Sequence, residues 1–166
     1  MNYNLSGRAA IRSICRRRLD LKLLIDSACE AFVETFAEQG ISLEVDVPQN
    51  LWVELDPILM REALRRLLEN AAEAMPHGGV VTITSLIGRN GLEIEIADSG
   101  PGISEDMQDG LFKPFVSGKE DHAGLGLSTV REIALVHQGS ITATDCPDGG
   151  AAFTLLLPLP SARMAA

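Results

Sequence analysis

Residues 80–97, VVTITSLIGRNGLEIEIA, contain two apolar stretches on either side of a short polar segment. Residues 80–87 and 92–97 are rich in β-branched and other apolar side chains, which is typical of β-strands. The Arg-Asn-Gly sequence at 89–91 between them suits a tight turn. We therefore predict an antiparallel hairpin at this point of the chain.

Three helices are predicted on the two sides of this hairpin. In residues 21–39, 57–75 and 125–137 the apolar side chains recur every three or four positions. This spacing places them on one face of a helix, which is then buried against the rest of the protein. We expect Gly139 to close the third helix, because glycine is the residue most often found just after a helix end.

Four further strands complete the predicted sheet. Residues 41–47 alternate between apolar and polar side chains, as in a half-buried strand, and 51–55 form a short partner strand. Residues 141–144 and 151–157 form a second hairpin. Helices and antiparallel hairpins in this arrangement predict an α+β two-layer sandwich, with three main helices packed on one face of a mixed, mostly antiparallel sheet.

Composition indicates one globular domain and disfavours several classes of partner. The 166 residues are 46% hydrophobic and 22% charged, and we expect 20–160 to form the domain. Residues 1–19 are expected to be a linker or the remnant of an upstream helix, and 161–166 a tail. The net charge of -9 disfavours contact with nucleic acid or with an anionic membrane. Because the sequence has neither a membrane-spanning apolar stretch nor a signal-peptide pattern, a cytoplasmic location is expected.

Four short segments contain residues suited to nucleotide binding. They are 67–74 (LLENAAEA), 98–103 (DSGPGI), 112–115 (FKPF) and 124–128 (GLGLS). In this order they resemble the asparagine, first glycine, phenylalanine and second glycine boxes of the GHKL ATPase superfamily, specifically the catalytic ATP-binding domain of sensor histidine kinases. The resemblance covers residues 21–158, and it implies a Bergerat fold that binds ATP and Mg²⁺.

Asp98 ends a hydrophobic strand, so its carboxylate is expected at the bottom of a largely apolar cleft. There it can accept a hydrogen bond from an amino group such as that of adenine. Gly100 and Gly102 follow it, and their lack of a side chain lets the backbone approach a flat base or a phosphate. Taken alone, this segment also fits an ordinary surface turn.

Gly124 and Gly126 lie at the start of the predicted third helix, just before Leu127 and Ser128, where free N–H groups and the positive end of the helix dipole suit a triphosphate. The resemblance implies that Lys119 lies in a nucleotide lid, where it can meet the outer phosphates. The chain departs from the family pattern at Ala123, where threonine is common. The resemblance implies further nucleotide contacts, from Glu73, Ile103, Phe115, Leu125, Leu127 and Thr154.

Asn70 lies on the flank of the apolar face of helix 57–75, where its amide oxygen suits Mg²⁺. We expect Glu73 and Arg66 to share this flank, one turn to either side. Arg66 stands where ATP-hydrolysing relatives have the glutamate that activates water and many histidine kinases have asparagine. Because arginine stays protonated, it cannot be that base. Glu69 points away from the apolar face and is expected to be a solvated helix residue.

These residues predict a domain that binds Mg-ATP and presents the γ-phosphate to a histidine. His77, His122 and His137 lack the sequence context of a phosphoacceptor, so that histidine is expected on a separate dimerisation domain, with a response regulator downstream. Details such as the residues following Asn70 resemble the nitrogen- and flagellar-regulation branch of the kinases. Alone, the domain is expected to be a monomer. An anti-sigma-factor-type serine kinase and a non-catalytic nucleotide-binding scaffold are the alternatives.

Overall fold

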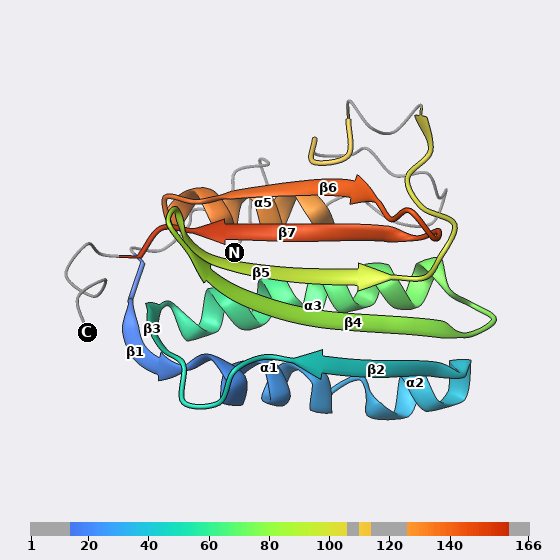
Figure 1. The fold of residues 1–166 in the computed structure, drawn as a ribbon, viewed down its shortest axis with the longest axis horizontal. Coiled ribbons are helices and arrows are strands. Elements are labelled where there is room, and N and C mark those ends of the chain that lie inside the picture. Colours follow the sequence, from blue (N-terminus) through green and yellow to red (C-terminus); the bar gives the residue numbers. More distant parts are fainter. Residues whose placement is uncertain (1–13, 106–109, 114–125, 160–166) are drawn as a thin grey trace, which may run out of the picture.

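The computed structural model describes residues 14–105, 110–113 and 126–159, which fold into two layers (Figure 1). One layer is a five-stranded sheet, in which β2 and β4 are parallel and the other neighbouring strands are antiparallel. Its strands, in spatial order, are β2 (Ile41–Asp46), β4 (Gly79–Gly88), β5 (Gly91–Asp98), β7 (Ala151–Leu157) and β6 (Ser140–Asp145).

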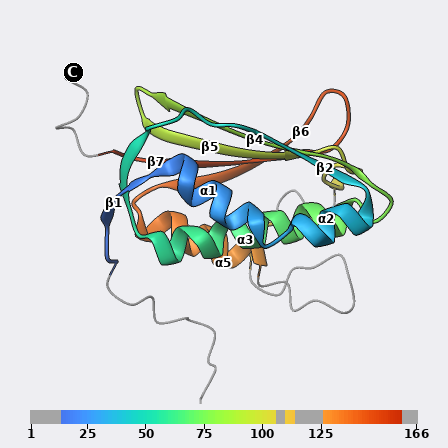
Figure 2. The same cartoon turned by 90° about the horizontal axis from the view of Figure 1, so that it is seen from below.

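The described helices lie together on one face of this sheet (Figure 2). They are α1 (Leu21–Glu30), α2 (Val33–Gln39), α3 (Pro57–Ala74) and α5 (Gly126–Val136). α3 packs against α1 on one side and against α5 on the other. The predicted α+β sandwich with a mixed, mostly antiparallel sheet is therefore confirmed. In the described part of the chain, no helix is long and apolar enough to cross a membrane.

The β4–β5 hairpin is confirmed, and its register separates the two faces of the sheet. Paired residues run from Val81 opposite Asp98 to Gly88 opposite Gly91. Ile94 and Ile96 of β5 are fully buried under the helices, whereas Glu93 and Glu95 alternate with them on the helix-free face. Asp98 belongs to the same series as Ile94 and Ile96, so its side chain faces the helix layer.

The predicted helix over 21–39 is two helices, α1 and α2, so that prediction is wrong in detail. The chain turns between Glu30 and Val33 because the two parts pack on different partners, α1 mainly on α3 and α2 mainly on β2. Phe32 at the turn and Phe36 are both buried, with ring centroids 5.5 Å apart. One straight helix would not bury its apolar stripe against both partners.

Residues 17–19, which belong to the segment expected to be a linker or the remnant of a helix, are part of a strand. This strand is β1 (Arg17–Asp20), which pairs antiparallel with β3 (Trp52–Leu55) in a separate two-stranded sheet. Residues 51–55 were predicted to pair with the strand 41–47. Instead, Trp52–Leu55 pair with β1. The guanidinium of Arg18 lies 5.2 Å from the ring centroid of Trp52, which helps to hold the pair. The sequence of β1, Arg-Arg-Leu-Asp, contains a single apolar residue and therefore gives no alternating strand signal.

The end of α5 also differs from the prediction. Gln138, not Gly139, has the left-handed conformation, with φ 63°. The Gly139 N–H donates to the carbonyl of Ala134 at 2.8 Å, and a Cβ at Gly139 would overlap the carbonyl of Leu156. Glycine is thus required there by close packing against β7 rather than by its backbone dihedral angles.

Candidate nucleotide site

Asp98 is the buried polar residue at the end of β5, and it is 5% exposed. Its Oδ1 accepts hydrogen bonds from the N–H groups of Gly100 at 2.9 Å and of Ala151 at 3.4 Å. Burial raises the pKa of this carboxyl group, and the two hydrogen bonds oppose that shift. Within the described residues both bonds end on Oδ1, which leaves Oδ2 to accept from a ligand.

The glycines after Asp98 let the backbone pass close to its neighbours. A Cβ at Gly100 would lie 2.8 Å from Asp98 Oδ1 and 3.1 Å from the Cβ of Ala74. Since Ala74 is one helical turn after Asn70, this contact brings the end of β5 to the end of α3. Gly102 has φ +83°, a conformation that favours glycine.

Ile103 and Phe112 meet beyond this turn. They line a cavity of about 300 Å³ together with Leu111 and the last residues of β6. The Ile103 N–H donates to Asp145 Oδ1 at 2.7 Å, which fixes the segment against β6. The structure thus brings the first glycine box and the start of the phenylalanine box together.

Asn70 is half-buried on α3, and Gly126 and Leu127 are half-buried at the start of α5. A Cβ at Gly126 would lie 4.0 Å from Cδ of Arg66, so the start of α5 is adjacent to α3 one turn before Asn70. Four predicted contact residues, Phe115, Lys119, Gly124 and Leu125, lie outside the described residues.

Two predicted contact residues lie elsewhere. Thr154 of β7 is on the helix-free face, where its Oγ1 donates to Glu95 Oε2 at 3.2 Å, so the sheet separates it from Asp98. Glu73 is exposed and lines a cavity of about 450 Å³ with residues of α1–α2 such as Phe32, on the opposite side of α3 from α5.

Ala151 is the contact that sequence reasoning missed. Its backbone N–H, not its side chain, bonds Asp98, so its residue type gives no signal. The signal is in the glycine before it, because Gly150 has φ +97° and a Cβ there would overlap the Asp98 carbonyl. The Gly149–Gly150 pair therefore marks the start of β7 as a neighbour of the site.

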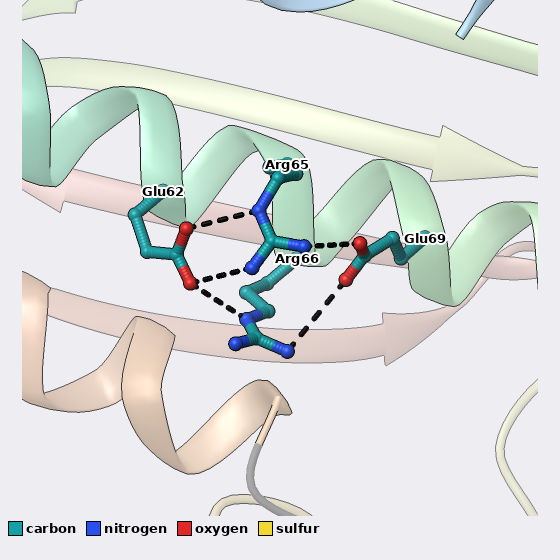
Figure 3. A network of polar contacts seen from close by, with 4 residues as sticks. All are labelled: Glu62, Arg65, Arg66 and Glu69. Carbon is teal, nitrogen blue, oxygen red and sulfur yellow. Dashed lines mark hydrogen bonds and ion pairs between the residues drawn. The ribbon is translucent and has the colours of Figure 1, made fainter. Parts of the chain in front are cut away.

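Four charged side chains of α3 form a network along the part of the helix that precedes Asn70 (Figure 3). Glu62 accepts from Arg65 at 2.7 and 2.9 Å and from Arg66 Nε at 2.8 Å. Glu69 pairs with Arg65, and its Oε2 lies 3.7 Å from Arg66 Nη1. Glu69 is therefore ion-paired with two arginines rather than simply solvated.

The described side chains fit a metal ion that takes most of its ligands from phosphate. They do not form a complete coordination shell by themselves. Within the described residues no group of three or more His, Cys, Asp or Glu side chains is arranged to hold a metal ion. The Asn70 amide oxygen is a hard ligand of the kind Mg²⁺ prefers, and Mg²⁺ normally takes its remaining ligands from phosphates and water.

Comparison with known proteins identifies the family. Residues 55–161 match the family described as histidine kinase-, DNA gyrase B- and HSP90-like ATPase, and the chain belongs to it. The resemblance to the catalytic domain of sensor histidine kinases is thus confirmed.

Adaptive-response sensory kinase SasA of Microcystis aeruginosa is 34% identical over 148 residues, which are 83% of this chain and 38% of that protein. Sensor histidine kinase ZraS of Escherichia coli K12 is 31% identical over 146 residues, or 87% of this chain and 31% of that protein. The chain therefore spans well under half of the length of these relatives.

Solved structures agree with this assignment. The catalytic domain of histidine kinase ThkA has a TM-score of 0.81 and 28% identity, covering 87% of this chain and 96% of that one. Full-length ShkA in complex with AMPPNP has a TM-score of 0.81 and 27% identity, covering 92% of this chain and 33% of that one.

Proposed function

We propose that this chain binds Mg-ATP between α3, the end of β5 and the start of α5. The observation that supports this most is the buried Asp98, whose side chain faces the helix layer and whose Oδ1 accepts from the Gly100 N–H. A carboxylate that accepts from the adenine amino group would orient the base. The N-terminus of α5 then suits the phosphates. The AMPPNP complex of the similar ShkA supports the same class of ligand.

Bound Mg²⁺ would neutralise charge on the triphosphate. Asn70 is the described residue that we propose as its ligand. Arg66 precedes it by one turn and cannot remove a proton from water. This chain's own residues therefore bind and orient the nucleotide, and they do not include a hydrolytic base at that position.

We further propose that the γ-phosphate passes to a histidine on a phosphoacceptor and dimerisation domain, and from there to a response regulator. The relatives that support this are themselves named as sensory or sensor histidine kinases. On this proposal the domain works in the cytoplasm, makes no membrane contact and is a monomer when isolated.

Nucleotide binding is tested by calorimetric titration with ATP in Mg²⁺. Asp98→Asn is expected to abolish binding, because the amide presents a donor to the adenine amino group. The matched control is Glu95→Gln, on the same strand but on the helix-free face, and it should bind as the wild type does. Equal loss in both variants would contradict the placement of the site.

Phosphoryl transfer is tested with γ-labelled ATP and a separately purified phosphoacceptor hairpin. The expected product is acid-labile phosphohistidine on the hairpin. Acid-stable phosphoserine, or ATP binding without any labelling, would contradict transfer to histidine.

A further inference from the structure

Arg66 reaches from α3 toward the start of α5 (Figure 3). It precedes Asn70 by four residues, so the two side chains share one face of the helix. Its Cδ lies 4.0 Å from the position of a Cβ on Gly126, the first residue of α5. The guanidinium is therefore next to the helix end that the proposed function gives to the phosphates.

Two carboxylates hold Arg66 in this position. Glu62 accepts from its Nε at 2.8 Å, and Glu69 lies 3.7 Å from its Nη1. Hydrogen bonds, from Arg65 first and then from Arg66, lower the pKa of Glu62 despite its partial burial, so it is ionised at neutral pH. The side chain is thus oriented before a ligand arrives, which reduces the entropy lost on binding.

Arg66 keeps donors for a further partner. A guanidinium has five N–H donors, and among the described residues the contacts of Arg66 use Nε and Nη1. Its side chain is 34% exposed, so the remaining donors are accessible. Their planar arrangement matches the oxygens of a phosphate.

We propose that Arg66 binds the triphosphate directly, beside the N-terminus of α5. This inference rests on the proposed function. An arginine cannot ligate a cation, so Arg66 supplies positive charge to the phosphates directly. An asparagine at this position would instead share a Mg²⁺ ion with the phosphates. ATP binding by this chain should therefore depend less on Mg²⁺ than it does in a variant without the guanidinium.

The experiment is calorimetric titration with ATP, in EDTA and in Mg²⁺. In EDTA, Arg66→Gln should weaken ATP binding at least about tenfold, the scale expected for a lost hydrogen bond to a charged group. In Mg²⁺ the loss should be smaller, and Arg66→Lys should recover part of it. Arg65→Gln is the matched control, because Arg65 belongs to the same network but lines the cavity toward α1–α2.

The control also separates binding from helix stability. Arg65→Gln should bind ATP as the wild type does, and thermal unfolding should show all variants folded. Equal losses in Arg65→Gln and Arg66→Gln, or unchanged binding by Arg66→Gln, would overturn the inference while leaving the proposed function intact. Failure of the wild type to bind ATP even in Mg²⁺ would overturn both.

Discussion

At the scale of single residues, the carboxylate of Asp98, the proposed adenine ligand, is buried at a cost to stability. Burial raises its pKa above 3.8 even though two N–H groups bond it. The folded chain then holds the proton more tightly than the unfolded chain, so stability falls as pH rises through this range. At neutral pH the ionised carboxylate is therefore destabilising, and a bound amino group would offset that effect.

Asp98→Asn should consequently melt no lower than the wild type at pH 7, although it loses ATP binding. The amide oxygen can still accept from Gly100 and Ala151, and the buried charge is gone. Thermal unfolding followed by circular dichroism measures this. A clear drop in melting temperature would show that the carboxylate is structural instead.

His137 gives stability the opposite dependence on pH. It is 1% exposed, its Nδ1–H donates to the Ile133 carbonyl at 2.8 Å, and its Nε2 accepts from the Asp56 N–H at 3.1 Å. Burial lowers its pKa below 6.5, while Asp56 and the Ile133 carbonyl act against that shift and Arg16 adds to it. The unfolded chain then takes up the proton first, so this contribution is present above pH 6.5 and is lost as pH falls below it.

We predict that the free energy of unfolding, measured with urea, declines from pH 7 toward pH 5. His137→Gln should flatten that decline and should cost about 1–3 kcal/mol at pH 7, since it disturbs buried hydrogen bonds. His77→Gln, at an exposed position, is the control and should leave the slope unchanged. An unchanged slope in His137→Gln would assign the decline to other groups.

At the scale of elements, the N-terminus of α3 is fixed more firmly than that of α1. Asp56 caps α3 by accepting from Ile58 and Leu59, and its Oδ2 also accepts from Cys15 at 2.8 Å. Asp20 caps α1 through Lys22 and Leu23 alone among the described contacts. The cap of α3 therefore also ties the segment before β1 to the helix that bears Asn70.

Asp56→Ala should thus destabilise the domain more than Asp20→Ala does. Loss of an ordinary cap costs about 1 kcal/mol, which is the expectation for Asp20→Ala. Asp56 is buried and its removal also leaves the Cys15 N–H without its acceptor. Urea unfolding of both variants makes the comparison, and equal losses would mean that the Cys15 contact contributes nothing.

Most of the helices and strands could be predicted from the sequence alone. Periodicity in the sequence predicts the helix 57–74 and both hairpins. It also predicts the position of Asp98, because the alternation of apolar and polar residues along a strand determines which face each side chain occupies. β1 was missed because only one of its four residues, Leu19, is apolar. Thr154, which the resemblance implied as a nucleotide contact, lies on the helix-free face; which face it occupies depends on the register of β7 with β5, and sequence spacing does not define that register.

At the scale of the whole molecule, the sheet separates the proposed nucleotide site from its helix-free face, which carries Glu93 and Glu95. The site lies where the end of β5 meets the end of α3 and the starts of β7 and α5. These segments are far apart in the sequence, and the antiparallel pairing of β5 with β7 brings Ala151 to Asp98. The other face presents Glu93, Glu95 and Thr154 and has no part in the account of binding.

Nucleotide binding between α3, the end of β5 and the start of α5 is tested most directly by mapping backbone amide shifts by NMR while Mg-ATP is added. We predict that the amide signals of Gly100, Gly102, Ala151 and Gly126 shift, whereas those of Ser42 and other β2 residues at the far edge of the sheet do not. Shifts concentrated around the cavity between α1–α2 and α3, or no shifts at saturating nucleotide, would contradict this prediction.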